Sequence, residues 1–457
     1  MSSIINHKAD RALVLAGGGM RVAYQAGVLL ALEEGNYLFK HVDGTSGGIF
    51  NTAMLASGVK VRSIAERWRS LNVMWFSSLR KFKNYLHPFR MKGYADTDNI
   101  KHKVFRHMGI AVDRINRNTD SYTFNICNFS NKAIEPIPNE KVMEDHLLAG
   151  VSLPILMPAL KIKNEWYTDA VWIKDANLID ASSKGVAEIW LVWAIGNNHN
   201  YLDGAFNQYV HMIEMSAGGA LLQEFEQMKF DPQLNLSLHV IKPDYPLPLD
   251  PDLFFNKIDT RSLINMGYAD AKNYLGNIKS EGVPMDAAAT KMREPGDRLH
   301  IHCVFQGAIE RENDRQDIQL FCYYRYSIIN EAETIITLFA SIKLEEEEYP
   351  LFNTSTNLKL ENEGLFLVTE ALLYIHSVQH NFTIKLPVIS SIDPLIGLAF
   401  KTAEIKLANE QKCYEGELKQ SISHRLKNCL RMNVLTADGR HGSLKTKYKM
   451  LNQLLRV

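Results

Sequence analysis

The sequence predicts an α/β fold with a mostly parallel central sheet, followed by a second, β-rich α+β domain. Between residues 12 and 195, short apolar runs alternate with helical patterns, as expected when helices join parallel strands. The composition changes at residues 292–298, a Pro/Gly turn with charge on both sides, and the segments that follow are typical of antiparallel strands. Because 457 residues exceed the size at which one core keeps growing, we predict domains at 1–290 and 297–457.

The individual elements follow from hydrophobic periodicity and from the turn residues between the periodic segments. Gly35 and Gly58 each stop a helical pattern. In the first domain we expect strands at 12–15, 39–42, 121–130 and 188–195, and helices at 21–34, 48–57, 208–228 and 263–275. In the second domain we expect strands at 299–306 and 318–328, then a helical tail from about Leu395.

Composition and charge are those of an ordinary globular protein. Hydrophobic residues make up 46% and charged residues 22%, and 51 basic residues balance 51 acidic ones, so nothing global calls for nucleic acid. The five scattered cysteines lack metal-site spacing and are expected to be free thiols. No apolar run approaches the roughly 20 residues of a membrane span. These observations predict a cytoplasmic protein without a cofactor.

Three consecutive glycines, Gly17 to Gly19, lie between an apolar run and a helical pattern, and leave the backbone bare for a ligand. A dinucleotide fold would require another motif glycine where Val22 stands, and a phosphate-binding loop would require G-K-[ST] after the triplet. The sequence has neither. Unobstructed N–H groups beside a helix N-terminus also suit the oxygen of a reacting ester.

A second glycine-rich motif supports the ester interpretation. Residues Gly44 to Gly48 read G-x-S-x-G at the junction of a strand and a helix. In a nucleophile elbow, this sharp turn lifts the serine hydroxyl above the sheet, and the glycines let neighbouring backbone pass closely. Ser46 is therefore the candidate nucleophile, Gly44 and Gly48 are the elbow glycines, and the upstream triplet is the candidate oxyanion hole. Asp43, directly before the motif, is expected to stabilise the turn.

These motifs resemble those of the patatin-like phospholipase family, G-G-G-x-R-G, G-x-S-x-G and D-G-[GA]. The resemblance runs over roughly residues 10–280. It implies a three-layer α/β/α domain and a Ser–Asp dyad that uses neither histidine nor metal. By the match to the motifs, Ser46 is implied as nucleophile, Asp169 as base, and the glycine triplet with Arg21 as the oxyanion site.

The chain departs from the family pattern at two positions. Val22 replaces the last glycine of the first motif, and the third motif reads Asp169-Ala170-Val171. The resemblance implies hydrolysis of phospholipid or lysophospholipid esters through an acyl-enzyme, and the same intermediate would allow acyl transfer to another acceptor. An alternative from a different class is a lipid-binding or scaffold protein in which the two departures have weakened the site.

Two other residues compete for the role of the base. Asp175 is the rival carboxylate, although Asp169 stands where the family motif places its aspartate. A Ser–His–Asp triad would use the same elbow, with a histidine on a loop after a late strand. His199 is the candidate for that histidine, but the early glycine triplet favours the dyad.

Residues 67–95 indicate a route to lipid. They contain basic residues and no acidic ones, and their aromatic and leucine residues recur at spacings of three and four. Such a basic amphipathic helix suits an anionic membrane surface or a lid over an acyl channel, or else packs on the domain with a solvated basic face. His300 and His302 share a strand face, but no third ligand is in view, so we expect exposed strand histidines rather than a metal site.

Overall fold

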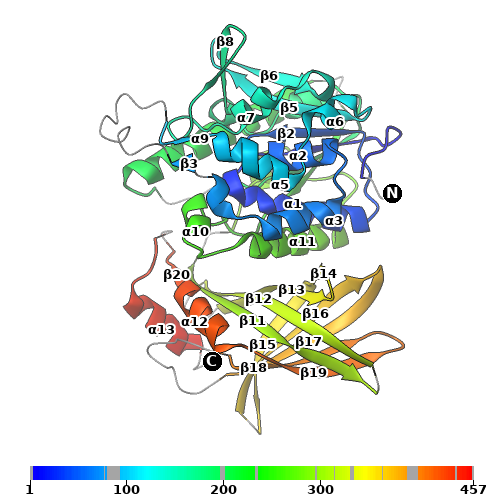
Figure 1. Ribbon diagram of the computed structural model, residues 1–457, viewed down its shortest axis with the longest axis vertical. Coiled ribbons are helices and arrows are strands. Elements are labelled where there is room, and N and C mark those ends of the chain that lie inside the picture. The colour runs from blue at the N-terminus through cyan, green and yellow to red at the C-terminus, as the bar shows by residue number, and fades with distance from the viewer. Residues whose placement is uncertain are drawn as a thin grey trace. The chain divides into compact units, whose positions relative to one another are not determined.

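The computed structural model describes residues 4–454 apart from 77, 80–92, 196–200, 232–234, 294–295, 313, 330–333, 363, 389–399 and 438–439 (Figure 1). The chain forms two units, each with its own core. The first comprises Met1–Phe255 and Asp259–Met292, and the second comprises Asn256–Ile258 and Arg293–Val457.

The first unit is built on a mixed sheet. Among the described residues its order is β10-β9-β1-β2-β5-β8-β7, with β6 paired to β5. The strands are β1 (Arg11–Leu15), β2 (His41–Thr45), β5 (Ser121–Asn128), β6 (Ala133–Pro138), β7 (Leu160–Ile162), β8 (Glu165–Thr168), β9 (Glu188–Val192) and β10 (Ser237–Ile241). The run from β10 to β5 is parallel, as expected for the central sheet, although strand β10 itself was not predicted. The antiparallel edge formed by β6, β7 and β8 was not predicted.

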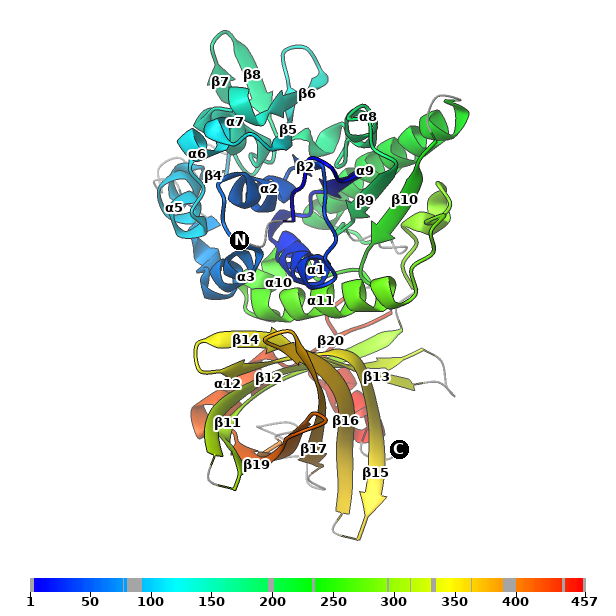
Figure 2. The same ribbon diagram turned by 90° about the vertical axis from the view of Figure 1, so that its right-hand side faces the viewer.

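Helices cover both faces of this sheet. Ala12 and Val14 of β1, and Ala16 directly after it, share a core with apolar side chains of α8 and α9. The opposite face carries α2, and α1 and α11 lie side by side (Figure 2). The helices are α1 (Ala23–Glu34), α2 (Gly48–Ala56), α3 (Val61–Ser70), α5 (Phe105–Met108), α6 (Val112–Arg117), α7 (Glu144–Gly150), α8 (Leu178–Ser182), α9 (Ala205–Phe230), α10 (Asp250–Phe254) and α11 (Thr260–Gly276).

Short helical turns join several of these elements. They are η1 (Gly19–Val22), η2 (Val73–Phe76), η4 (Ile100–Val104), η5 (Asn139–Lys141), η6 (Ala170–Trp172) and η7 (Ala287–Ala289). The strand predicted at 39–42 corresponds to β2, which begins at His41 and continues to Thr45, the residue before Ser46. Within the described ranges, no helix has both the length and the apolar character needed to cross a bilayer.

Helices α1 and α11 meet backbone to backbone. A Cβ added at Gly27 would lie 1.9 Å from the Ile264 carbonyl oxygen, and one added at Gly267 would lie 1.9 Å from the Tyr24 carbonyl oxygen. Each helix therefore presents a glycine where the other helix passes. Any larger side chain at either position would push the two helices apart.

The single amphipathic helix expected at residues 67–95 is wrong in its described part. Helix α3 ends at Ser70, the turn η2 follows, and β3 (Ser78–Leu79) pairs with β4 (Ala95–Asp96). Trp68, the first aromatic residue of the predicted apolar helix face, is fully buried and stacks on Phe76. This first part of the predicted face is therefore buried in the core of the domain. The basic residues of 80–92 lie outside the described residues, and the membrane contact stays a prediction.

The second unit is a large antiparallel sheet. Among the described residues its order is β14-β13-β12-β11-β19-β18-β17-β16-β15, with β20 paired to β11. The strands are β11 (Asp297–Arg311), β12 (Asp314–Ile328), β13 (Thr334–Leu344), β14 (Glu347–Pro350), β15 (Phe352–Glu361), β16 (Gly364–Ile375), β17 (Val378–Pro387), β18 (Thr402–Ala408), β19 (Cys413–Lys419) and β20 (Asn433–Leu435). Its helices are α12 (Ile422–Arg431) and α13 (Leu444–Leu454).

Two expectations for the second unit are corrected. The predicted helical tail from Leu395 is wrong for β18 and β19, and helix begins only at α12, because each of these strands pairs along its length. His300 and His302 share a strand face but are buried rather than exposed. The His300 ring contacts the Tyr323 hydroxyl, and His302 Nε2 lies 3.0 Å from the Lys257 carbonyl oxygen.

Candidate active site

Strand β2 delivers Ser46 to a sharp turn before helix α2. Ser46 has φ of 51°, in the left-handed region that non-glycine residues rarely adopt. The backbone beyond it is tightly enclosed, because a Cβ at Gly47 would lie 2.5 Å from the Gly19 carbonyl oxygen and one at Gly48 would lie 2.0 Å from the Leu15 carbonyl oxygen. Gly44 would similarly place a Cβ 2.3 Å from Thr52 Oγ1. The turn thus has the strand–turn–helix form of a nucleophile elbow.

The Ser46 hydroxyl is hydrogen-bonded to a carboxylate that lies 123 residues further along the chain. Ser46 Oγ donates to Asp169 Oδ2 across 2.8 Å, and the two residues are 5% and 2% exposed. Asp169 follows β8 and caps η6, where its Oδ1 accepts from the Val171 N–H at 2.9 Å. Its own N–H donates to the Ser152 carbonyl oxygen at 3.1 Å. These bonds fix the carboxylate against the serine.

Burial also sets the basicity of Asp169. Desolvation raises its pKa from the ordinary value to about 7, although hydrogen bonds from Val171 N–H and the Ser46 hydroxyl act in the opposite direction. A carboxyl group with such a pKa is ionised in part at neutral pH and binds a proton readily. It therefore has the basicity that a general base needs.

The glycine triplet runs beside the elbow. Gly18 and Gly19 have φ of 145° and 60°, which explains the need for glycine at both positions. The Gly17 N–H donates to the Asp175 carbonyl oxygen at 3.2 Å and is already engaged. In the part of the chain described here, the N–H groups of Gly18, Gly19 and Gly47 have no hydrogen-bond acceptor. These three N–H groups are the candidates for an oxyanion site.

The Arg21 side chain contacts the backbone of the glycine loop. Its Nε donates to the Gly18 carbonyl oxygen at 3.0 Å, and the side chain is buried. This hydrogen bond holds the orientation of the Gly18 peptide. Arg21 therefore supports the candidate oxyanion site through the loop backbone.

Two further residues that no sequence motif indicated support the glycine loop: Gln25 of α1 and Asn51 of α2. Gln25 Nε2 donates to the Ala16 carbonyl oxygen at 2.5 Å, and Asn51 Nδ2 donates to the Val22 carbonyl oxygen at 3.0 Å and to Gln25 Oε1 at 2.9 Å. Both amides are fully buried. The sequence signal for each was a lone polar residue inside an apolar helix. Such a buried side chain needs hydrogen-bond partners, and the backbone of a buried loop can supply them.

The two departures from the family motifs fit this local structure. The Val22 side chain fills the space beside Gly47, where an added Cβ would lie 2.9 Å from Val22 Cγ1. Ala170 begins η6, is fully buried and is not among the residues with positive φ. A methyl group therefore causes no backbone strain at this position.

Two more carboxyl groups surround the glycine loop. Asp175 is fully buried, and within the described residues neither of its carboxyl oxygens has a hydrogen-bond partner. Burial, and next the charge of Asp169, raise its pKa well above the ordinary value. Asp250 of α10, which carried no signal in the sequence, accepts from the Met20 N–H at 3.0 Å.

The rival candidates take different places. Asp175 lies against Gly17, because a Cβ added there would be 2.0 Å from Asp175 Oδ1, whereas Ser46 bonds to Asp169. Asp43 lies within β2 and accepts from Asn125 Nδ2 at 2.6 Å, so it is a buried strand residue rather than part of the turn. His199 lies outside the described residues.

Part of the chain is similar to known proteins. The family model described as patatin-like phospholipase matches residues 13–181. The chain is similar to lysophospholipase nte1 from Aspergillus terreus, with 24% identity over 294 residues, which is 59% of this chain and 18% of the fungal protein. Only about a fifth of that relative is therefore represented.

A solved structure, VipD from Legionella pneumophila, is similar with 11% identity and a TM-score of 0.32 over 60% of this chain and 67% of VipD. The matched family segment contains the glycine loop, the elbow and Asp169. Residues 13–181 of this chain therefore match the patatin-like phospholipase family.

Proposed function

We propose that this protein hydrolyses fatty-acyl esters of the phospholipid or lysophospholipid type, with Ser46 as nucleophile and Asp169 as general base. The observation that carries the proposal is the buried 2.8 Å hydrogen bond from Ser46 Oγ to Asp169 Oδ2 at the elbow. The family model and the lysophospholipase relative support the substrate class.

The first half of the reaction forms an acyl-enzyme. Asp169 accepts the Ser46 proton as Oγ attacks the ester carbonyl, and the N–H groups of Gly18, Gly19 and Gly47 stabilise the developing oxyanion. The tetrahedral intermediate collapses, the C–O bond to the alcohol breaks, and the leaving oxygen takes the proton from Asp169. The acyl group is then bound to Ser46 Oγ.

The second half releases the fatty acid. Asp169 accepts a proton from water, whose oxygen attacks the acyl carbonyl, and the proton returns to Ser46 as the fatty acid leaves. An alcohol in place of water would give acyl transfer by the same steps. Product analysis with and without added lysophospholipid separates the two reactions.

A covalent probe tests the proposal directly. The intact protein is incubated with a lipid-like fluorophosphonate, and its mass is compared with that of Ser46→Ala. We expect one adduct per chain in the wild type and none in the variant, because the probe captures an activated serine. An adduct that persists in Ser46→Ala would assign the nucleophile elsewhere. Absence of labelling in both, with no ester cleavage, would favour a lipid-binding protein.

We also expect activity to rise with pH through about 7. The pKa of Asp169 is raised to about 7 by burial, and only the ionised carboxylate can accept the serine proton. The thiol of Cys127 and the hydroxyl of Tyr209 also have raised pKa values, so both stay neutral in this range. The kcat/KM of a soluble ester measured from pH 5 to 9 checks this, and a flat profile would contradict it.

A further inference from the structure

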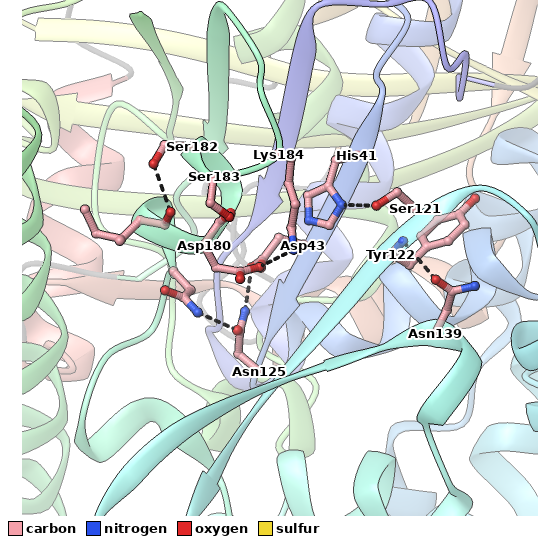
Figure 3. Close-up of polar contacts among 12 residues, drawn as sticks. His41, Asp43, Ser121, Tyr122, Asn125, Asn139, Asp180, Ser182, Ser183 and Lys184 are labelled. Atoms are coloured by element: carbon pink, nitrogen blue, oxygen red, sulfur yellow. Dashed lines mark hydrogen bonds and ion pairs between the residues drawn. The ribbon is translucent and has the colours of Figure 1, made fainter. Parts of the chain in front are cut away.

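Strand β2 carries a second polar group ahead of the elbow. His41 and Asp43 are in register with Ala12 and Val14 of β1, whose side chains pack with α8 and α9, so all four point to the same face of the sheet. Asp180 of α8 covers them, as Figure 3 shows. One nitrogen of His41 and one carboxylate oxygen from each aspartate lie within 4.8 Å of one another.

Outer hydrogen bonds orient the two strand residues. His41 Nδ1 lies 2.8 Å from Ser121 Oγ, and Asp43 Oδ1 accepts from Asn125 Nδ2 at 2.6 Å. Both side chains are fully buried, and in the described residues His41 Nε2 and Asp43 Oδ2 have no hydrogen-bond partner. When Nδ1 donates to Ser121, Nε2 carries the lone pair. His41 Nε2 and Asp43 Oδ2 are thus two buried polar atoms without a partner among the described residues, an arrangement that proteins avoid.

The third member already has a cation beside it. Asp180 Oδ2 lies 3.0 Å from Lys184 Nζ, one helical turn further on. The side chains of Asp180 and Lys184 are 17% and 29% exposed, so this side of the cluster reaches solvent. The Lys184 ammonium supplies a single positive charge beside two carboxylates.

We propose that His41, Asp43 and Asp180 bind a first-row divalent cation such as Zn²⁺ or Mn²⁺. One imidazole nitrogen with two carboxylate oxygens is a ligand set that these ions accept. Ser121 and Asn125 serve as the outer hydrogen-bond partners that protein metal ligands commonly have. Ligands about 2.0–2.2 Å from a tetrahedral Zn²⁺ lie about 3.3–3.6 Å apart. The three ligand atoms, which lie within 4.8 Å of one another, must therefore approach each other by up to about 1.5 Å to close on the ion.

The ion has a structural role in this proposal. It joins β2, which ends beside Ser46, to α8 on the covering layer, and it neutralises the buried Asp43 carboxylate and the partly exposed Asp180 carboxylate with one charged group. It takes no part in the ester chemistry. The inference is therefore independent of the proposed function.

Binding to the full-length protein, first treated with a chelator, tests the site. Calorimetric titration with Zn²⁺ and with Mn²⁺ is expected to show one saturable site and a raised Tm. Asp180→Asn should weaken binding by at least about 100-fold, because a charged ligand is lost. Asp113→Asn, which changes an exposed carboxylate paired with Arg117, is the matched control and should bind as the wild type does.

Lys184→Met distinguishes a metal site from a plain ion pair. With the competing ammonium removed, the metal should bind more tightly than in the wild type, and the loss of Tm in the metal-free variant should be recovered on adding the ion. Absence of saturable binding in the wild type, equal binding in Asp180→Asn, or a Lys184→Met protein that stays destabilised in Zn²⁺ and Mn²⁺ would each overturn the proposal.

Discussion

Ester hydrolysis by the Ser46→Ala protein is expected to fall by at least about 10⁴-fold, because the acyl group then has no oxygen to attach to. Folding should be little affected. The hydroxyl makes one hydrogen bond, to Asp169, and the residue lies at the end of a strand rather than in an apolar cluster. The rate constant kcat measured on a lysophospholipid, with Tm as the check on folding, tests this expectation.

Ser57→Ala is the matched control. Ser57 follows the same helix, α2, is also buried, and accepts one hydrogen bond from the Ala111 N–H at 3.0 Å. Its loss should lower stability by about 1 kcal/mol and leave kcat unchanged. Equal loss of activity in both variants would show that damage to α2, rather than removal of a nucleophile, is responsible.

The second large effect is expected for Asp169→Asn. An amide cannot accept the serine proton, so activity should fall by about 10³-fold. Stability should change in the opposite direction. Burial raises the pKa of Asp169 to about 7, above its unfolded value, so its contribution to stability is complete below about pH 4 and is lost as pH rises through 7. Above pH 7 the variant should be more stable than the wild type, by up to about 4 kcal/mol.

The Asp175→Asn variant distinguishes the role of Asp175 from that of Asp169. Asp175 is buried beside Gly17 but makes no hydrogen bond to Ser46, so its replacement should preserve most of the activity. Urea unfolding at pH 5 and pH 8, with kcat at each pH, tests both variants. Greater loss of activity in Asp175→Asn than in Asp169→Asn would assign the base to Asp175.

Local sequence signals predicted most elements of the parallel part of the first sheet. The strands and helices around the glycine loop and the elbow lie where apolar runs and glycines indicated, because a buried parallel strand and its helix are both short-range patterns. The antiparallel edge strands β7 and β8 were missed, since each is short and exists through its pairing. The segment after Trp68 was misassigned because spacing alone does not distinguish an apolar face buried in the core from one that meets lipid.

In the candidate site, too, some residues could be predicted from the sequence and others could not. The sequence motifs nominated Ser46 and Asp169, and the resemblance placed them together although they are far apart along the chain. Motifs do not show which N–H groups are occupied. The engagement of the Gly17 N–H by Asp175, and the approach of Asp250 to Met20, depend on how distant segments meet. Such contacts need three-dimensional coordinates.

The paired glycines of α1 and α11 have a consequence for the length of the autonomous folding unit. The family match ends at residue 181, but α11, at Thr260–Gly276, supplies the surface that the helix beside the glycine loop packs against. A fragment cut after residue 181 would expose that helix to water and would also lack β9, the hydrogen-bonded neighbour of β1. The shortest segment able to fold alone must therefore extend through α11, well beyond the part of the chain that the family model matches.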